Sequence, residues 1–338
     1  MTVLPGLFWA LLLAQQAPPP IQDVLVLPKS DEPYDSLSLS PDGKTVVAYF
    51  RTSSVLRTWS VEDGGKNPKS LKFTNSTPWQ FALNESGTRL LASTAEEIVE
   101  WDLQAGTVPK TAPRPIDPAN PNDSTRSSGL LPTADGKGLF ISSGFKQHLV
   151  LLSAETLEVI QWLPFDGVVP ESVSSDGLTL ICRTEQQELY VCDLKKQRLS
   201  RILKHPGLSQ VNVSADGKLA ASSGNLGEYP KKVEGSIRIW DVDKGKLLRQ
   251  WKTDGLIRSI ALSPPGGVLA TLSDQVPGSP ILTFWDTTTG KAVWAPLKAS
   301  GDARCLSFSR EGKRLAFVGT DGSLHVVNVP PTSFVAPK

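Results

Sequence analysis

A four-residue turn motif recurs along the chain at a nearly constant interval, and this repeat limits the possible folds more than any other feature. The motif reads Ser-Pro-Asp-Gly at 40–43, and related tetrapeptides end at six further glycines, 40 to 49 residues apart. The marker glycines are Gly43, Gly87, Gly136, Gly177, Gly217, Gly266 and Gly312. Periods of this length are typical of solenoids and propellers. Seven such units fill residues 21–334, which predicts one domain rather than two.

Each unit predicts four antiparallel strands. Ser or Asn first, Pro second and Gly fourth suit a type I turn whose last residue is left-handed, so the motif joins a hairpin. Alternating apolar residues precede it, as in 37–39, and a continuous apolar run follows it, as in 46–50. A third apolar strand then ends in a characteristic pair such as Trp101-Asp102. A short polar turn and a fourth strand complete the unit.

These units resemble the WD-repeat family of β-propellers over residues 21–334. The residues that carry the resemblance are the repeat markers Asp42, Gly43, Trp59, Trp101, Asp102, Gly136, Gly177, Gly217, Trp240, Asp241, Trp285, Asp286 and Gly312. The resemblance implies an all-β fold, a seven-bladed propeller of four-stranded antiparallel blades with tryptophans packed between blades. The last unit offers only three strands, while residues 24–27 have no unit of their own. We expect this N-terminal strand to complete blade seven and close the ring.

The histidines depart from the family pattern. Many WD repeats carry Gly-His ahead of the first strand, and this His joins Ser, Asp and Trp in a hydrogen-bond network. No Gly-His dipeptide occurs here, and His148, His205 and His325 do not share one repeat position. We therefore expect the network to be absent. The chain is more similar to WD-like bacterial propellers with Ser-Pro-Asp-Gly turns than to the stricter eukaryotic type.

The N-terminal residues differ from the repeats. Residues 4–14 carry no charge and are mostly apolar, and 15–20 are polar and then proline-rich. We predict a signal peptide at 1–17, a proline linker at 18–20 and a tail at 335–338. The protein would then be exported, to the periplasm or outside the cell, and it would be cytoplasmic if the segment is no signal peptide. A membrane span needs about 20 apolar residues, so none is expected in the mature chain.

Charge and cysteine content narrow the function classes. The 35 Lys and Arg against 34 Asp and Glu argue against nucleic-acid binding, which requires a basic excess. The basic stretch at 195–204 is expected to be a solvated face. Cys182 and Cys192 lie on neighbouring strands, and a two-residue turn at 186–187 would set Cys182 opposite Val191. A disulfide is possible there, but two small buried side chains are the preferred interpretation, and Cys305 is expected to be buried.

Local catalytic motifs are absent from the sequence. There is no G-x-S-x-G motif, no P-loop, no dinucleotide fingerprint and no H-x-x-x-H spacing. The segment 241–252 begins like a calcium loop but has Lys252 in place of the twelfth-position Glu. We predict no catalytic residues, no metal and no cofactor.

The lengths of the connections give the main functional clue. The turns between first and second and between third and fourth strands lie at one rim, here named the turn face, and are short. The other connections lie at the opposite rim, the loop face, which carries the insertions 108–129, 224–235 and 274–280. Rigid scaffolds commonly bind through such loops. The predicted partner-binding residues are Arg114, Asp117, Asp123, Arg126, Tyr229, Lys231, Lys232 and Glu234.

Two function classes follow from this pattern. The first is a non-enzymatic scaffold, monomeric on its own, that binds another protein through the loop face. The alternative is a propeller enzyme or small-ligand binder that uses the central channel mouth, as some lactonases, quinoprotein dehydrogenases and glycosidases do. Such sites draw single residues from several blades and leave no local motif. Neutral variation of the loops, without any partner, also remains open.

Overall fold

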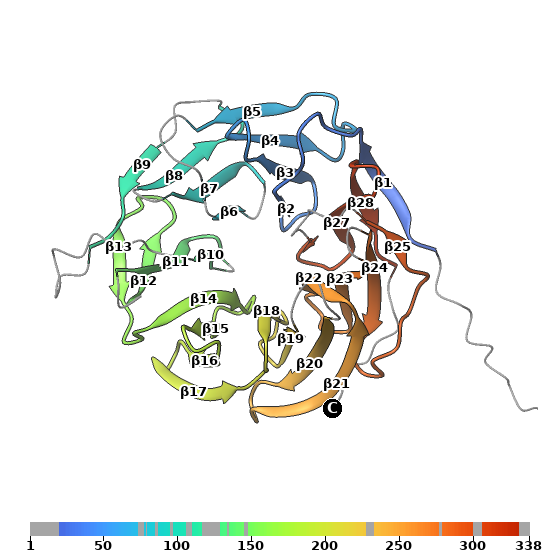
Figure 1. Ribbon diagram of the computed structural model, residues 1–338. Coiled ribbons are helices and arrows are strands. Elements are labelled where there is room, and N and C mark those ends of the chain that lie inside the picture. Colours follow the sequence, from blue (N-terminus) through green and yellow to red (C-terminus); the bar gives the residue numbers. More distant parts are fainter. Residues whose placement is uncertain are drawn as a thin grey trace, which may run out of the picture.

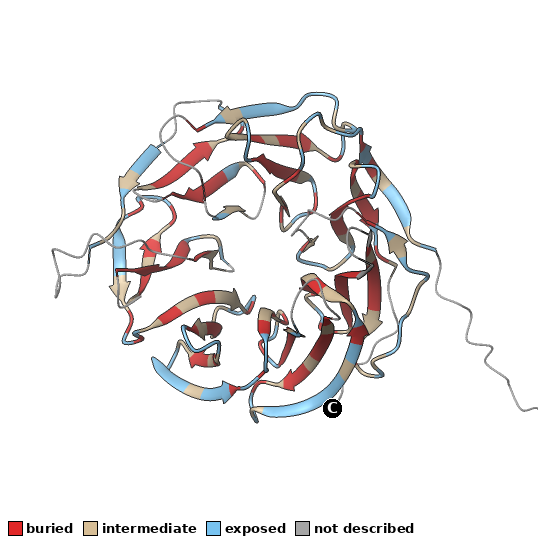
Figure 2. Ribbon diagram, viewed as in Figure 1, coloured by how far each residue is buried: buried red, intermediate tan, exposed pale blue. Residues whose placement is uncertain are grey.

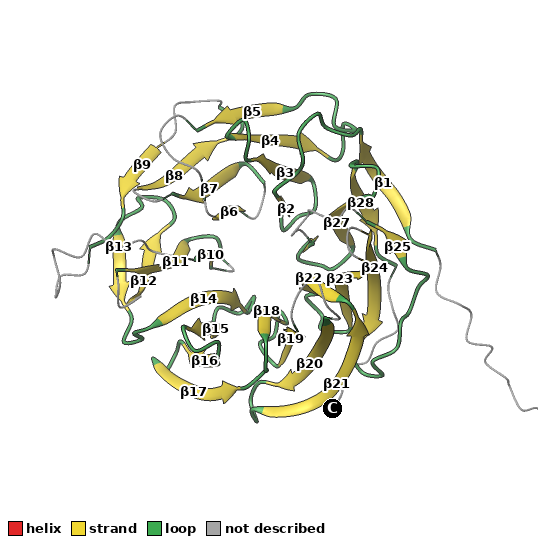
Figure 3. Cartoon of the chain, viewed as in Figure 1, coloured by secondary structure: helices red, strands yellow, loops and turns green. Residues whose placement is uncertain are grey.

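The chain forms a ring of seven four-stranded sheets around a central axis, seen in a computed structural model (Figure 1). The structure describes residues 20–73, 78, 80–84, 87–94, 97–105, 110–116, 129–133, 135–144, 148–227, 233–276, 279–299 and 306–330. Over these residues the elements are strands and connections (Figure 3), and no helix among them could cross a membrane. The predicted seven-bladed propeller is confirmed.

The strands follow the chain from the axis outward in each blade. Blade one contains β2 (Ser36–Leu39), β3 (Thr45–Phe50), β4 (Val55–Ser60) and β5 (Lys69–Lys72). Blade two contains β6 (Gln80–Leu83), β7 (Arg89–Ser93), β8 (Glu97–Asp102) and β9 (Lys110–Pro113). Blade three contains β10 (Leu130–Pro132), β11 (Gly138–Ser143), β12 (His148–Ser153) and β13 (Val159–Trp162). Blade four contains β14 (Val168–Val173), β15 (Thr179–Thr184), β16 (Leu189–Asp193) and β17 (Arg198–Leu203).

The remaining blades repeat this order. Blade five contains β18 (Leu208–Val213), β19 (Leu219–Leu226), β20 (Glu234–Asp241) and β21 (Lys246–Asp254). Blade six contains β22 (Leu256–Leu262), β23 (Val268–Val276), β24 (Ser279–Asp286) and β25 (Leu297–Lys298). Blade seven contains β26 (Ser307–Phe308), β27 (Arg314–Val318) and β28 (Leu324–Asn328), and β1 (Gln22–Leu27) is its outer strand.

The N-terminal strand closes the ring, as the sequence predicts. β1 pairs antiparallel with β28, with Gln22 opposite Asn328 and Leu27 opposite Leu324. Leu25 and Leu27 are buried in an apolar cluster that also contains residues of blade one. The blade therefore joins both ends of the repeat region, and its edge strand is supplied by the start of the chain.

The hydrogen bonds and backbone angles of the marker turns account for the residues found there. In the first, the Ser40 hydroxyl donates to Asp42 Oδ1 at 2.6 Å and accepts the amide of Thr45 at 2.9 Å. Asp42 Oδ1 also accepts the amide of Lys44 at 3.0 Å. The fourth position needs a left-handed backbone, with φ of +73° at Gly43, and all seven marker glycines have positive φ. The turn thus satisfies its polar groups internally.

Backbone hydrogen bonds join the marker turns of neighbouring blades. The amide at the second turn position donates to the carbonyl of the same position in the next blade, from Ser175 to Ala215 at 2.8 Å and from Ala215 to Pro264 at 2.7 Å. Arg310 donates likewise to Pro41, from blade seven to blade one, at 2.7 Å. The carbonyls of Pro264 and Pro41 accept these hydrogen bonds. Neither proline has an N–H group, so neither can donate the corresponding hydrogen bond to the next blade.

The core lies between the blades, and the outer strands are the most exposed (Figure 2). Trp59, Trp101 and Trp240 are buried, and each packs in a cluster with residues of the preceding blade. Their predicted packing role is confirmed. Trp294 precedes β25 and packs edge-on against Phe284, with ring centroids 5.2 Å apart.

The register of blade four differs from the expected one. Cys182 lies opposite Tyr190, not Val191. The amide of Thr184 bonds to the carbonyl of Glu188, and Gln187 takes a φ of +61°, so the connection has three residues rather than two. Cys182 and Cys192 consequently share one face of the sheet, where both are buried and form no disulfide. The thiol of Cys192 donates to Cys182 Sγ over 3.7 Å. Burial raises the pKa of the Cys182 thiol. Cys305 lies outside the described residues.

Candidate functional site

The structure describes two of the eight predicted partner-binding residues, Arg114 and Glu234. Arg114 follows the outer strand of blade two and Glu234 begins the third strand of blade five, so they lie on separate blades. Glu234 pairs with Lys252 of the neighbouring strand at 2.7 Å, and both side chains are exposed. Six further predicted residues lie outside the described part of the chain: Asp117, Asp123, Arg126, Tyr229, Lys231 and Lys232.

Arg114 anchors the start of the longest insertion. Its Nη2 donates to the hydroxyl of Ser93, at the loop-face end of β7, over 2.5 Å. The next residue, Pro115, accepts a hydrogen bond from the hydroxyl of Ser143 in blade three. Burial lowers the pKa of Arg114 to about 10. The segment 114–116 therefore crosses from the outer strand toward the second strands of two blades, and Arg114 acts here as a structural anchor.

Ion pairs hold the ends of the inner strands at the loop face. In blade one, Arg51 Nη2 lies 3.1 Å from Asp35, and in blade six Arg258 Nη2 lies 2.5 Å from Asp274. Both pairs use the same repeat positions, five residues before the marker Ser and eight after the marker Gly, with the charges exchanged. These pairs form no local motif in the sequence, because the two partners are 16 residues apart. The repeat numbering is the signal that could have found them.

Blade four has its own ion pair near the same rim. Glu171 of the inner strand pairs with Arg183 of the second strand at 2.7 Å. Burial raises the pKa of Glu171, and the guanidinium of Arg183 opposes this shift. An irregularity in the pairing of β14 falls between Pro170 and Ser172, which is where Glu171 lies. Such bulges re-aim one side chain, here toward the arginine.

A buried histidine network in blade five corrects one expectation. His205 Nδ1 lies 2.8 Å from the hydroxyl of Ser222, and its Nε2 lies 2.8 Å from that of Ser236. Trp240 Nε1 donates to the same Ser222 oxygen at 2.8 Å. The expected absence of a His, Ser and Trp network is therefore wrong for this blade. No Gly-His dipeptide marks this network in the sequence, because Lys204 precedes the histidine. Burial, then the charge of Arg238, lowers the pKa of His205 to about 4.

A series of hydrogen bonds between side chains links β28 to the closing strand β1 in blade seven. The hydroxyl of Ser323 donates to Asp321 and lies 2.7 Å from His325 Nε2, while His325 Nδ1 lies 2.9 Å from Asp23 of β1. A serine, a histidine and an aspartate in this order could form a nucleophilic site. Here the serine is 3 % exposed and its proton is directed at Asp321. The arrangement fits a clasp between β28 and β1.

In the acidic turn that resembles a calcium loop, the carboxylate of Asp241 is bound by groups of the same turn. Asp241 Oδ1 accepts the amide of Lys244 at 2.9 Å, and its Oδ2 pairs with the Lys244 ammonium at 3.0 Å. These contacts lower the pKa of Asp241, the backbone hydrogen bond contributing most. Across the residues that the structure describes, no three His, Cys, Asp or Glu side chains gather as metal ligands would.

Comparisons with known proteins give one partial similarity. No family model matches the chain. A stretch of 83 residues is 30% identical to a protein described as eukaryotic translation initiation factor 3 subunit I, from Scheffersomyces stipitis. The match covers 24% of this chain and 21% of that protein. The chain therefore spans about a fifth of the length of the relative it matches.

Proposed function

We propose that this WD-repeat-like β-propeller is a non-enzymatic scaffold that binds a partner protein through its loop face. The main support for this proposal is the difference between the connections at the two faces. The marker turns of the turn face are short and internally hydrogen-bonded, whereas the longest stretch between two strands, 114–129, belongs to the loop face. The insertion expected at 274–280 is instead mostly strand, because β23 runs to Val276 and β24 begins at Ser279. The anchor at Arg114 and the ion pairs at the inner strands give these loops a fixed base. The matched relative is named as a subunit of a larger factor, which supports an assembly role.

We propose further that the protein is exported and that residues 1–17 are its signal peptide. The support is the uncharged, mostly apolar segment at 4–14 followed by a proline-rich stretch. N-terminal sequencing of the protein from its source cells tests this. A mature chain that starts near residue 18 is expected, and a chain that retains residues 4–14 would contradict export.

Replacing residues 117–128 with a short Gly-Ser linker is expected to abolish partner capture. The change removes Asp117, Asp123 and Arg126 but keeps Arg114, whose contact with Ser93 holds the preceding segment. Because hot-spot residues carry most interface energy, binding should fall at least about tenfold. Thermal unfolding should change little. The measurement is affinity capture from an extract of the source organism, followed by titration of the captured protein.

A turn-face variant provides the matched control. Lys313→Ala removes an exposed cation that pairs with Glu311 of the same turn at 2.5 Å. This variant should capture the same partner as the wild type. Capture that survives loss of 117–128 would contradict the proposed face. Turnover or stabilisation by a small molecule, with no protein captured, would instead favour a ligand site at the channel mouth.

A further inference from the structure

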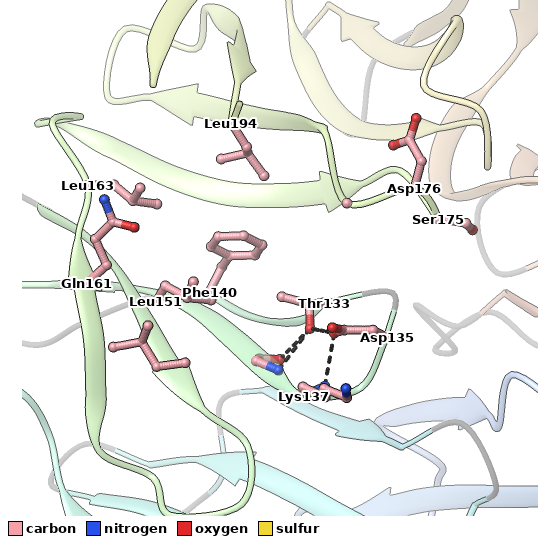
Figure 4. A pocket seen from close by; sticks show the side chains of 13 residues that line it. Thr133, Asp135, Lys137, Phe140, Leu151, Gln161, Leu163, Ser175, Asp176 and Leu194 are labelled. Atoms are coloured by element: carbon pink, nitrogen blue, oxygen red, sulfur yellow. Dashed lines mark hydrogen bonds between the residues drawn. The ribbon is translucent and has the colours of Figure 1, made fainter. Parts of the chain in front are cut away.

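The turn face has a cavity of about 380 Å³ between blades three and four (Figure 4). Its floor is apolar, formed by Phe140 and Leu163 of blade three, with Leu151 and Leu194 beside them. Its mouth is polar and includes Asp135 and Asp176, one from each marker turn. Binding pockets of about 300–1,000 Å³ are typical of ligand sites. This cavity lies on the face opposite the proposed partner loops.

The next interface shows what covers the same surface elsewhere in the ring. Phe140 and Leu163 have the repeat positions of Ile181 and Leu203 in blade four. Ile181 and Leu203 pack in one cluster with Trp240 of the following blade. An indole thus covers this surface between blades four and five.

Between blades three and four the chain supplies no such indole. The residue of blade four at the tryptophan position is Cys192, opposite Leu180, whereas Trp240 lies opposite Ala220. A leucine opposite this position does not exclude an indole, since Leu90 lies opposite Trp101 in blade two and Leu269 opposite Trp285 in blade six. The missing indole is therefore a property of residue 192 itself. Phe140 and Leu163 are buried in one cluster with Leu180 and Cys192 of blade four. The cavity lies at the edge of this cluster, beside the half-buried Leu151 and Leu194, and it reaches Ile160, which is 58 % exposed.

The mouth of the cavity favours a positive charge. Asp135 Oδ1 accepts the hydroxyl of Thr133 at 2.5 Å and the amide of Lys137 at 3.0 Å, and these contacts keep the carboxylate ionised. Asp176 Oδ1 likewise accepts the hydroxyl of Ser174 at 2.5 Å. The lining contains two carboxylates and one ammonium, that of Lys137. A cation beside the apolar group of a ligand would therefore be attracted.

We propose that this cavity binds the aromatic side chain of a partner peptide, an indole flanked by lysine or arginine. The ring packs on Leu151 and Leu194, at the outer edge of the cluster that contains Phe140 and Leu163. The flanking cation lies near Asp135 and Asp176. This site is independent of the loop face, so either proposal can fail without the other.

Isothermal titration of the full chain with the peptide acetyl-Lys-Trp-Lys-amide tests the site. Binding with a dissociation constant below about 1 mM is expected. The peptide acetyl-Lys-Leu-Lys-amide should bind at least tenfold more weakly because it lacks the ring, and acetyl-Glu-Trp-Glu-amide because its charges are repelled. Equal binding of the leucine peptide would overturn the aromatic assignment, and equal binding of the acidic peptide would overturn the role of the carboxylates.

Two variants locate the site. Leu194→Arg places a charge in the floor, and Ile160→Arg changes only the exposed lip, so the second remains informative if the first does not fold. Each should weaken binding of the Lys-Trp-Lys peptide at least fivefold. The control is Ile202→Arg, at a residue 50 % exposed on the outer strand of blade four and outside the cavity. Unchanged affinity in folded Ile160→Arg, or an equal loss in the control, would overturn the proposal.

Discussion

Replacing Leu25 and Leu27 with alanine together is expected to destabilise the protein by about 5 kcal/mol or more. Each buried Leu→Ala change costs about 2–5 kcal/mol, and the two side chains are 4 % and 5 % exposed. A native protein is stable by only about 5–15 kcal/mol. Loss of this contact also frees β28 as an open edge. Urea unfolding followed by circular dichroism measures the change.

Val26 provides the matched control, since it lies between the two leucines on the same strand and is 49 % exposed. Val26→Ala should shift the free energy of unfolding by no more than about 0.5 kcal/mol. Equal effects of the buried and exposed changes would show that β1 does not hold the ring closed. A double variant as stable as the wild type would lead to the same conclusion.

His205→Ala is expected to cost about 2–4 kcal/mol. The change removes the hydrogen bonds to the hydroxyls of Ser222 and Ser236 and leaves a cavity, and unsatisfied buried polar groups cost about 1–3 kcal/mol each. Trp240→Phe removes only the indole donor to Ser222 and should cost about 1 kcal/mol. Chemical denaturation at pH 7.5 measures both. A His205→Ala cost no larger than that of Trp240→Phe would contradict the network.

The same histidine should make stability depend on pH. Its pKa is lowered to about 4 in the folded chain, against 6.5 for the free side chain. Above pH 6.5 it is neutral in both states and its contribution is complete. Between pH 6.5 and 4 the unfolded chain binds the extra proton, so stability falls as the pH falls, by up to about 3 kcal/mol.

His205→Asn isolates this contribution because asparagine does not titrate. The difference in unfolding free energy between wild type and variant should shrink as the pH is lowered from 6.5 to 4. Below pH 4 it should be constant, since His205 is then protonated in both states. A difference that stays constant from pH 7.5 to 4 would contradict the neutral, buried histidine.

The repeat allowed the whole architecture to be predicted from sequence. A turn such as 40–43 needs its Ser, Asp and Gly for local hydrogen bonds and a positive φ, so the turn is visible in the residues themselves. The missing strand of the last unit and the unassigned residues 24–27 predicted the closure. Register was harder, because one residue in the turn after Thr184 decides which side chains face Cys182.

The features of the candidate site were less predictable. The network of His205 joins residues 17 and 31 positions away, and no dipeptide marks it. The pairs of Asp35 with Arg51 and Arg258 with Asp274 become visible only when positions are counted from the marker turns. Arg114 was predicted to bind a partner, and its contacts show an anchor for the loop. The cavity at Phe140 depends on a tryptophan that blade four lacks, which a motif search does not detect.

The closure by β1 has a mechanical consequence. Gln22 and Asn328 are cross-strand partners, so the chain leaves the β1 and β28 pair at the same end on both strands. A force that pulls the two chain ends apart therefore acts across the strands and loads the hydrogen-bonded pairs one after another, as in a zipper. If the force acted along the strands instead, in shear, all hydrogen-bonded pairs between β1 and β28 would bear it at the same time. Tension on the ends should therefore open blade seven first, at low force, and then release the other blades in turn.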